Sequence, residues 1–263
     1  MRTLKLTLAY DGTNYVGWQR QDNGVSIQQV VEESLAPIAG GDAPTVSAAS
    51  RTDAGVHALG QVVSVSAAID LEPVAVQRAM NVRLPADIRV LAVEEAAPGF
   101  HARSFSISKA YRYRIVTRSV LSPFDRWYVW HHPIPKDIEL MQVAAAALVG
   151  KHDFASFQAA GSAVRATVRT LTRVDVRETP GEIVIDVEGD GFLRHMVRAI
   201  VGTLADVGTG ARSAASIADT LAAKDRRTAG TTAPGAGLTL MAVRYCPRFL
   251  RRPVHGRATK DLR

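Results

Sequence analysis

The sequence predicts an α+β protein in which two ferredoxin-like halves share one continuous antiparallel sheet. The pattern before residue 95 follows the order strand, helix, strand, strand, helix, strand, which is typical of one such half. A comparable order returns after residue 104, and 263 residues with 47% hydrophobic content suffice for one large core or two small ones. We therefore expect an N-terminal half over 1–103, a C-terminal half over 104–246, and a basic tail over 247–263 that is disordered or loosely docked.

The first strand and the first helix have the clearest local signals. Residues 4–8 alternate leucine with polar or small side chains, as a half-buried strand does, and Asp11-Gly12 then turns the chain. Ser26 and Gln29 have the spacing of a capping box, and apolar residues recur on one helical face as far as Ile38. The remaining elements expected in this half are strands over 45–50, 61–67 and 88–93 and a helix over 73–83 that begins at a proline.

The C-terminal half repeats this layout with one additional helix. A Pro180-Gly181 turn joins two of its strands into a hairpin. The expected elements are, in order, a strand over 106–117, a helix over 137–149, strands over 167–177 and 182–188, helices over 192–207 and 213–223, and a strand over 238–245.

The loop between residues 11 and 26 combines aromatic, amide and guanidinium side chains without the periodicity of a core element. Its members include Asn14, Tyr15, Trp18, Gln19, Arg20 and Gln21. Such side chains can stack on bases and hydrogen-bond to phosphates or base edges, as they do in proteins that recognise accessible RNA bases. From the residues alone, a polar loop in which Trp18 is a buried anchor is an equally good interpretation.

The stretch SRTDAGVHALG, residues 50–60, places one carboxylate, Asp53, on a tight connection between two expected strands. Gly55 and Gly60 allow a sharp turn or a close approach to a ligand. Arg51 lies two positions before Asp53, so in an extended chain both side chains point to the same side, where the arginine favours the ionised carboxylate. An ionised aspartate is suitable as a nucleophile, although Asp before a small residue and Gly is also ordinary turn chemistry.

Two further pairs of residues are candidates for a site. Tyr111 and Tyr113 share one face of their strand and the two neighbouring arginines share the other. A tyrosine in a cleft could stack on a flipped base and assist removal of a proton, although a core tyrosine is the commoner case. Arg194 and Arg198 are four apart in an expected helix and so share a face, from which they could hold a phosphate or a carboxylate. A solvated helix face is the ordinary explanation for them.

Composition limits the classes of partner and cofactor. The net charge of +7 and the pI near 9.8 favour an anionic partner, either nucleic acid or an acidic membrane. No apolar run approaches the roughly 20 residues of a spanning helix, so we expect a cytoplasmic protein without a membrane partner. Cys246 is the only cysteine, which excludes an intramolecular disulfide. No phosphate-binding glycine motif is present, and the histidines at 131, 132, 152 and 195 lack partners at ligand spacing, so neither a metal nor a nucleotide cofactor is expected.

Five stretches, taken together and in this order, resemble the tRNA pseudouridine synthase A family. They are YDGTNYVGWQRQ from Tyr10, RTDAGVHA from Arg51, FHARSFSISKAYRYRI from Phe100, GFLRHMVRAIVGTL from Gly191 and LAAKDRRTAGTTAPGAGLTL from Leu221. The resemblance covers nearly the whole chain as far as about Tyr245. It implies the pseudouridine synthase fold with a central RNA-binding cleft. It also implies that a homodimer, without a cofactor, isomerises uridine to pseudouridine at positions 38, 39 and 40 of the tRNA anticodon stem-loop.

The resemblance also assigns roles to individual residues. It makes Asp53 the nucleophile or base that starts glycosidic cleavage, Arg198 its ion-pair partner and Tyr111 the residue that packs on the uracil. The side chains expected to bind the RNA are Trp18, Gln19, Arg20, Arg51, Arg194 and His57, the last because it adjoins the Asp53 loop. Ser50 is a departure, because the family commonly has glycine at that place.

Two other classes of function also fit parts of the sequence. A non-catalytic RNA-binding protein could use the same two halves, and its binding would survive replacement of Asp53. A metal-dependent RNA phosphodiesterase could use Asp11, Asp53 and Asp190 as ligands, although these acids lack the spacing of a metal motif. Since a fold alone does not fix a function, the ordered stretches decide in favour of the synthase.

Overall fold

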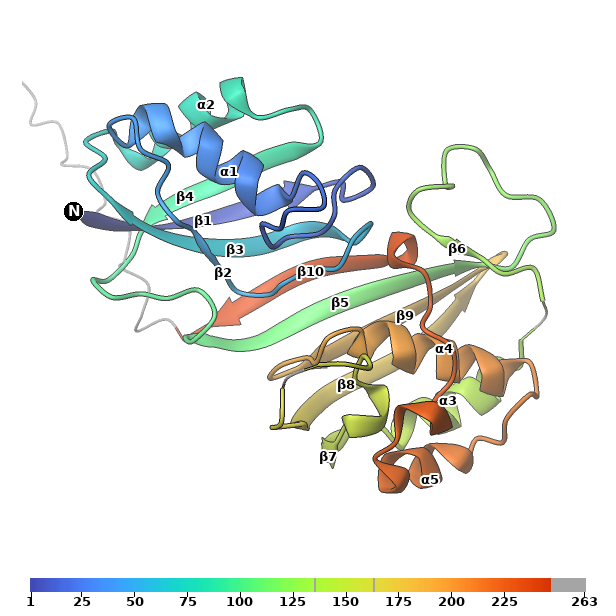
Figure 1. Ribbon diagram of the computed structural model, residues 1–263. Helices are drawn as coiled ribbons and strands as arrows, with labels where there is room; N and C mark the ends of the chain where they lie inside the picture. Colours follow the sequence, from blue (N-terminus) through green and yellow to red (C-terminus); the bar gives the residue numbers. More distant parts are fainter. Residues whose placement is uncertain (135, 163, 247–263) are drawn as a thin grey trace, which may run out of the picture.

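A computed structural model of the chain describes residues 1–134, 136–162 and 164–246 (Figure 1). These residues form one long twisted sheet of ten strands, with two groups of helices packed against its two ends. Helices α1 and α2 cover the strands of the N-terminal half, and α3, α4 and α5 lie against those of the C-terminal half. The tail expected over 247–263 lies outside the described residues.

The N-terminal half has the element order that the sequence predicts. Its elements are β1 (Arg2–Tyr10), α1 (Ile27–Leu35), β2 (Ser47–Ala48), β3 (His57–Ala67), α2 (Pro73–Arg83) and β4 (Ile88–Glu95). The Ser26 side chain caps α1 by accepting a hydrogen bond from the Gln29 backbone N–H at 3.2 Å. The capping-box prediction is therefore confirmed at its N-cap residue.

The C-terminal half contains the expected strands and helices and two short strands besides. Its elements are β5 (Ser106–Val116), β6 (Trp130–His131), α3 (Ile138–Ala146), β7 (Gly150–Asp153), β8 (Val168–Thr179), β9 (Glu182–Gly189), α4 (Met196–Gly208), α5 (Ser216–Ala223) and β10 (Leu238–Tyr245). The hairpin of β8 and β9 turns at Gly181, whose φ of 77° is readily available only to glycine.

Strand β10 joins the two halves into one sheet. The strand order is β4-β1-β3-β10-β5-β9-β8-β7, so the last strand in sequence lies between β3 and β5. It runs antiparallel to β5 and parallel to β3, where only Thr239↔His57 and Leu240↔Ala58 are paired. The predicted α+β fold with a continuous sheet is thus confirmed, but the sheet is mostly rather than wholly antiparallel. The division between the halves at residues 103 and 104 stays a prediction.

The core lies between the sheet and its helices. Leu4, Leu6 and Leu8 are fully buried, as their alternation predicts, and belong to one cluster with the buried face of α1. On the other half, Met196 and Ile200 of α4 are equally buried in the same cluster. A single apolar core therefore runs under both groups of helices and holds the two halves in one relative position.

Helix α4 begins four residues later than the sequence predicts. It starts at Met196 rather than at residue 192, because His195 has a φ of 62° and a ψ of 2°. This left-handed conformation cannot occur inside an α-helix of L-residues. Arg194 consequently lies in the turn before α4, and the prediction that it shares a helical face with Arg198 is wrong.

Gly60 lies at a close approach of the two halves. A Cβ at this position would lie 2.4 Å from the Met241 carbonyl oxygen and 3.2 Å from the Ala242 Cα, both backbone atoms of β10. Neither atom can move without displacing the strand. The absence of a side chain at residue 60 is therefore what lets β3 and β10 lie together.

We expect Gly60→Ala to lower the free energy of unfolding by at least about 2 kcal/mol, because overpacking against backbone cannot be relieved by a change of rotamer. Chemical denaturation would measure the loss. Gly191→Ala is the matched control, since its Cβ would meet only the flexible Arg169 side chain, at 3.3 Å from Nε. Equal stability of the two variants would contradict the account of this junction.

Candidate active site

The loop that carries Asp53 connects β2 to β3, as predicted. Those strands pair antiparallel through Ser47↔Ser64 and Ala48↔Val63. The loop closes with a hydrogen bond from the Val56 backbone N–H to the Asp53 carbonyl at 3.2 Å. Gly55 within it has a φ of 71°, so glycine is needed there for the turn.

Thr52 anchors the same loop from the side of β1. Its carbonyl accepts a hydrogen bond from the Trp18 backbone N–H at 2.9 Å, and its hydroxyl hydrogen-bonds to the Tyr10 hydroxyl at 2.8 Å. A Cβ at Gly17 would lie 2.7 Å from the Thr52 carbonyl oxygen. The segment around Trp18 therefore packs directly on the Asp53 loop and fixes its backbone.

Arg198 of α4 binds the Asp53 carboxylate from the other half of the chain. Its Nη1 donates to Asp53 Oδ2 at 3.0 Å, while its Nε donates to the Ala233 carbonyl at 2.7 Å. The side chains of Asp53 and Arg198 are only 22% and 16% exposed. Because the guanidinium is held at two points and is largely shielded from water, this ion pair is stronger than one at the surface.

His195 is a second neighbour of Asp53, which the sequence did not indicate. Its Nε2 lies 3.6 Å from Asp53 Oδ1. Burial lowers the pKa of His195 below its usual value and the nearby arginines lower it further, against the opposing effect of Asp53. The imidazole is therefore neutral at pH 7. Spacing gave no signal for this contact, because residues 53 and 195 belong to different halves and meet only in the fold.

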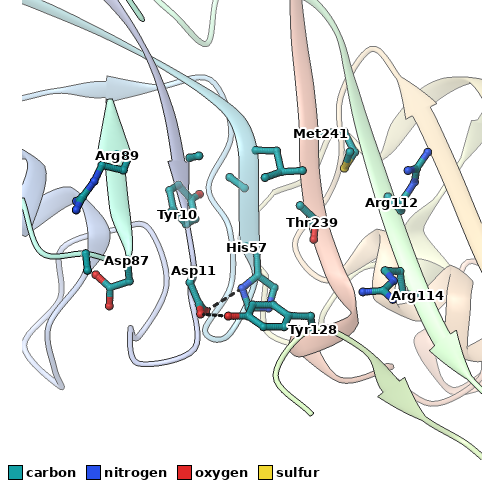
Figure 2. Close-up of a pocket in the computed structure, with 14 residues that line it drawn as sticks. Tyr10, Asp11, His57, Asp87, Arg89, Arg112, Arg114, Tyr128, Thr239 and Met241 are labelled. Carbon is teal, nitrogen blue, oxygen red and sulfur yellow. Dashed lines mark hydrogen bonds and ion pairs between the residues drawn. The ribbon is translucent and has the colours of Figure 1, made fainter. Parts of the chain in front are cut away.

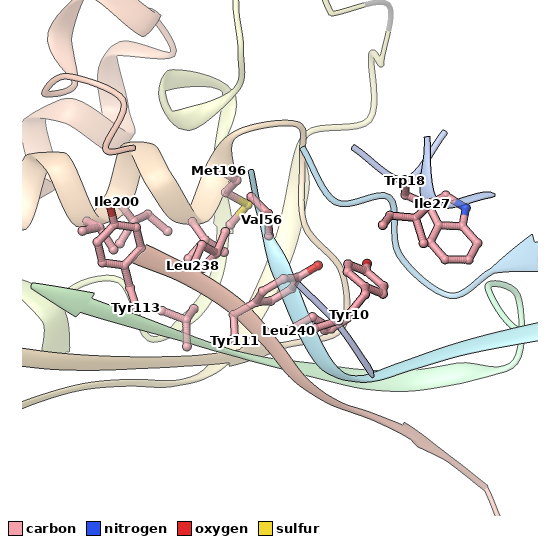
Figure 3. Packing of buried hydrophobic residues seen from close by; sticks show 14 of the residues in the cluster. Tyr10, Trp18, Ile27, Val56, Tyr111, Tyr113, Met196, Ile200, Leu238 and Leu240 are labelled. Carbon is pink, nitrogen blue, oxygen red and sulfur yellow. The ribbon is translucent and has the colours of Figure 1, made fainter. Parts of the chain in front are cut away.

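Tyr111 and Tyr113 have different environments although they share a face of β5. Tyr111 is 5% exposed, its hydroxyl hydrogen-bonds to the Ser50 hydroxyl at 2.7 Å, and its ring meets Phe192 edge-on at 5.1 Å. Tyr113 is fully buried and donates to the Pro234 carbonyl at 2.8 Å. Both belong to the buried cluster in Figure 3, but it is the Tyr111 hydroxyl that bonds to the Asp53 loop, whereas that of Tyr113 bonds to Pro234.

Burial also raises the pKa of Tyr111 well above its usual value, with Tyr10 and Asp53 adding to the rise and the Ser50 hydroxyl opposing it. The phenol is therefore protonated at neutral pH. It is available as a hydrogen-bond partner and as an aromatic surface rather than as a phenolate.

His57 lies in the wall of a separate cavity of about 520 Å³ (Figure 2). Its Nδ1 lies 3.1 Å from both the Gly12 backbone nitrogen and Asp11 Oδ1, and its Nε2 lies 2.8 Å from the Trp127 carbonyl oxygen. Figure 2 also shows Tyr128 bound to Asp11, and Asp53 is not among the residues that line this cavity. The expected contact of His57 with the RNA stays a prediction.

The remaining predicted RNA contacts differ in their surroundings. Arg51 and Arg194 are exposed. Arg20 is exposed too, but its Nη2 lies 3.3 Å from Glu32 Oε2. Gln19 donates to the Gln28 side chain at 2.8 Å. Trp18 is 2% exposed within the core, so the structure supports the buried-anchor interpretation for its indole.

The other candidate sites receive no support from the described part of the chain. In it, no group of three or more His, Cys, Asp or Glu side chains is placed to hold a metal ion. Asp11 is engaged by His57 and Tyr128, and Asp190 accepts a hydrogen bond from the Thr170 backbone N–H. No helix in residues 1–134, 136–162 and 164–246 is both long and apolar enough to span a membrane.

A profile of the tRNA pseudouridine synthase family matches residues 7–103 and 144–246, well over half of the chain. The chain belongs to this family. It is 46% identical over 248 residues to the tRNA pseudouridine synthase A of Syntrophotalea carbinolica, with 94% of this chain and 98% of the relative covered. The protein of the same name from Acidiphilium cryptum is 45% identical over 249 residues, with 93% and 97% covered.

Among solved structures, the likeness to a Cbf5-Nop10-Gar1 complex is weak. The identity is 11% and the TM-score 0.37, over 94% of this chain and 50% of the other, and the assignment does not depend on it.

The protein is therefore an isomerase that converts uridine to pseudouridine in tRNA, and the sequence-based prediction of family and activity is confirmed. Family membership also decides against the phosphodiesterase and the non-catalytic RNA-binding protein. Residues 104–143, which include β5 and Tyr111, fall between the two matched ranges.

The left-handed conformation of His195 leads to a stability prediction. We expect His195→Val to lower the free energy of unfolding by about 1–2 kcal/mol, because a branched Cβ is disfavoured at this φ, and His195→Gly to be more stable than the Val variant. Thermal unfolding of both would measure the difference. Arg194→Val, at the preceding residue, whose φ is not positive, is expected to change the free energy of unfolding little. Equal stability of the Val and Gly variants would show that residue 195 is unstrained.

Proposed function

We propose that Asp53 is the carboxylate that starts the isomerisation, that Arg198 fixes its orientation, and that Tyr111 packs on the uracil. The 3.0 Å contact between Arg198 Nη1 and Asp53 Oδ2 is the observation that carries this proposal. A carboxylate held on one oxygen by a doubly anchored guanidinium keeps one orientation toward a ribose placed beside it. Such preorganisation is the usual requirement of a catalytic constellation.

The chemistry requires one carboxylate and no redox carrier. The bond between uracil N1 and ribose C1′ breaks, the bond between C5 and C1′ forms, the C5 proton leaves and N1 takes up a proton. Asp53 takes part by attacking C1′, by adding to C6 of the base, or by removing a ribose proton to give a glycal. Tyr111 supplies an apolar ring and a protonated hydroxyl beside the base in each of these routes.

The proposed targets are the uridines at positions 38, 39 and 40 of the anticodon stem-loop. A target inside a stem must leave its stack, which costs a few kcal/mol. Arg51 and Arg194 are exposed on the two segments that bring Asp53 and His195 together, and we propose that they contact the RNA backbone. Gln19, Arg20 and His57 are further proposed contacts, whereas the buried Trp18 supports the Asp53 loop.

We also propose that the enzyme acts as a homodimer in the cytoplasm. Large apolar side chains such as Phe124 and Leu59 are 87% and 56% exposed, and a second copy of the chain would cover such surface. Size-exclusion chromatography with light scattering would test the oligomeric state.

Asp53→Asn is expected to abolish tritium release from tRNA carrying uridine labelled at C5, with a loss of more than about 10³-fold, because the amide cannot replace the carboxylate. Binding of tRNA should persist. Asp87→Asn serves as the control, since that carboxylate bonds to Tyr15. Release that is undiminished in the Asp53 variant would rule out the proposed role.

Binding of tRNA is expected to weaken steeply with salt, because a protein of net charge +7 displaces counterions from phosphates. Arg51→Ala or Arg194→Ala should each lower the slope of log K against log salt by about one. Arg83→Ala, at the exposed end of α2, should leave the slope unchanged. Salt-independent binding, or an equal effect of all three variants, would contradict these contacts.

A further inference from the structure

Gln61 is a buried polar residue of β3 with no exposed surface. Its Nε2 donates to the Ser50 carbonyl at 2.8 Å and to the Tyr10 hydroxyl at 3.2 Å, and its Oε1 accepts from the Ser50 backbone N–H at 3.4 Å. Both protons of the amide nitrogen are thereby used. The donor and acceptor pattern of Ser50 also determines which side-chain atom is the oxygen.

The Gln61 carboxamide binds the backbone of Ser50, just beyond the end of the hydrogen-bonded ladder between β2 and β3. The ladder continues past Ala48 with a bond from the Ala49 N–H to the Val62 carbonyl at 2.8 Å. At Ser50 the chain departs from β3, and the Gln61 side chain binds both the N–H and the C=O of Ser50. The Asp53 loop can therefore leave the sheet without burying unpaired backbone groups, which would each cost about 1–3 kcal/mol.

Two chains of hydrogen bonds lead from this carboxamide to the site. In the first, the Tyr10 hydroxyl accepts from Gln61 and shares a hydrogen bond with the Thr52 hydroxyl, in the residue next to Asp53. In the second, Gln61 holds the Ser50 backbone, and the Ser50 hydroxyl bonds to the Tyr111 hydroxyl at 2.7 Å. One side chain is thus linked both to the carboxylate loop and to the tyrosine of the opposite half.

We propose that Gln61 is a positioning residue that sets the Asp53 carboxylate and the Tyr111 phenol relative to each other. The inference rests on the roles proposed above for Asp53 and Tyr111. Gln61 itself reaches neither substrate nor reacting atoms, since it is fully buried and its amide hydrogen bonds all go to Ser50 and Tyr10. Its loss acts on turnover through geometry, where a displacement of about 1 Å can cost about 10²-fold in rate.

The first test is the single-turnover rate and the tRNA affinity of Gln61→Met, which keeps the volume of the side chain and removes all three hydrogen bonds. We expect the rate to fall about 10–100-fold while the tRNA dissociation constant stays within about twofold. Gln77→Met is the matched control. Gln77 of α2 also donates to backbone carbonyls, those of Leu91 at 2.7 Å and Val90 at 3.2 Å. These belong to the edge strand β4, which β1 separates from β3, so the rate of the Gln77 variant should be unchanged.

Gln61→Glu provides a pH signature that a general loss of stability would not give. An ionised glutamate cannot donate to the Ser50 carbonyl, whereas a protonated one restores the donor and the acceptor toward Ser50. Burial raises the pKa of a carboxyl group at such a site. The ratio of the Gln61→Glu rate to the wild-type rate is therefore expected to rise as the pH falls. The ratio of the Gln61→Glu rate to the Gln61→Met rate is likewise expected to be highest at acid pH.

The other titratable groups around this network do not produce that trend. Burial raises the pKa of Tyr10 to about 12 and that of Tyr111 further, so both phenols stay protonated throughout the range. Asp53, His195 and Arg198 lie beyond Ser50 and are common to both proteins, so the ratio of rates removes their contribution.

Two milder variants keep the test decisive if Gln61→Met does not fold. Tyr10→Phe removes the hydrogen bond to the Thr52 hydroxyl, and Ser50→Ala removes the hydrogen bond to the Tyr111 hydroxyl. Each is expected to lower the single-turnover rate with tRNA affinity retained. Wild-type rates in both milder variants, or a pH-independent ratio for Gln61→Glu, would overturn the inference.

Asp53→Asn, measured in the same assay, distinguishes failure of the inference about Gln61 from failure of the proposed function. If Asp53→Asn is inactive and the Gln61 variants turn over like wild type, Gln61 has no positioning role and the proposed function stands. If Asp53→Asn is active, the proposed function fails, and the inference about Gln61 fails with it.

Discussion

The ion pair between Arg198 and Asp53 is the contact on which the rest of the site depends. Its two members lie 145 residues apart and come from opposite halves of the chain. They meet because β10 joins the two halves into one sheet and because one apolar core extends beneath both groups of helices. Any change in the angle between the halves would separate the guanidinium from the carboxylate. The extended sheet thus fixes the distance between Asp53 and Arg198, which come from different halves of the chain.

The two faces of strand β5 illustrate how the sheet separates functions. One face carries Tyr111 and Tyr113, buried among apolar side chains under α4. On the other, Arg112 and Arg114 form ion pairs with Asp186 and with Glu182 of β9. The strand alternation therefore keeps these strong charges away from Asp53, so that among the described residues Arg198 is its ion-pair partner and His195 a neutral neighbour.

Local signals predicted the elements well, and tertiary contacts account for what they missed. Alternating leucines and a capping serine were enough to place β1 and α1. The start of α4 was wrong, because nothing in the sequence around His195 announces a left-handed residue. The two tyrosines of β5 could not be separated by a period of two, and their different roles depend on which hydroxyl meets the Asp53 loop.

The site residues show the same division. Asp53 was found because a carboxylate between an arginine and a glycine turn is visible in the sequence, and Arg198 because of a resemblance. His195 was set aside because it lacks partners at ligand spacing, and the carboxylate that it meets, Asp53, is remote in sequence. Gln61 gave no signal at all, because a glutamine in a strand pattern looks like a solvent-facing residue and only the fold shows that it is enclosed.

The place of β10 in the sheet has a consequence for how the molecule forms during synthesis. It is the last strand in sequence, yet it fills the gap between β3 and β5. Until residues 238–245 have been made, both neighbouring strands present unpaired edges, which are prone to pairing with other chains. The nascent protein thus passes through a long interval in which its halves exist without the strand that aligns them. The pairing of β10 with β3 and β5 therefore both completes the site and protects the two strands from pairing with other chains.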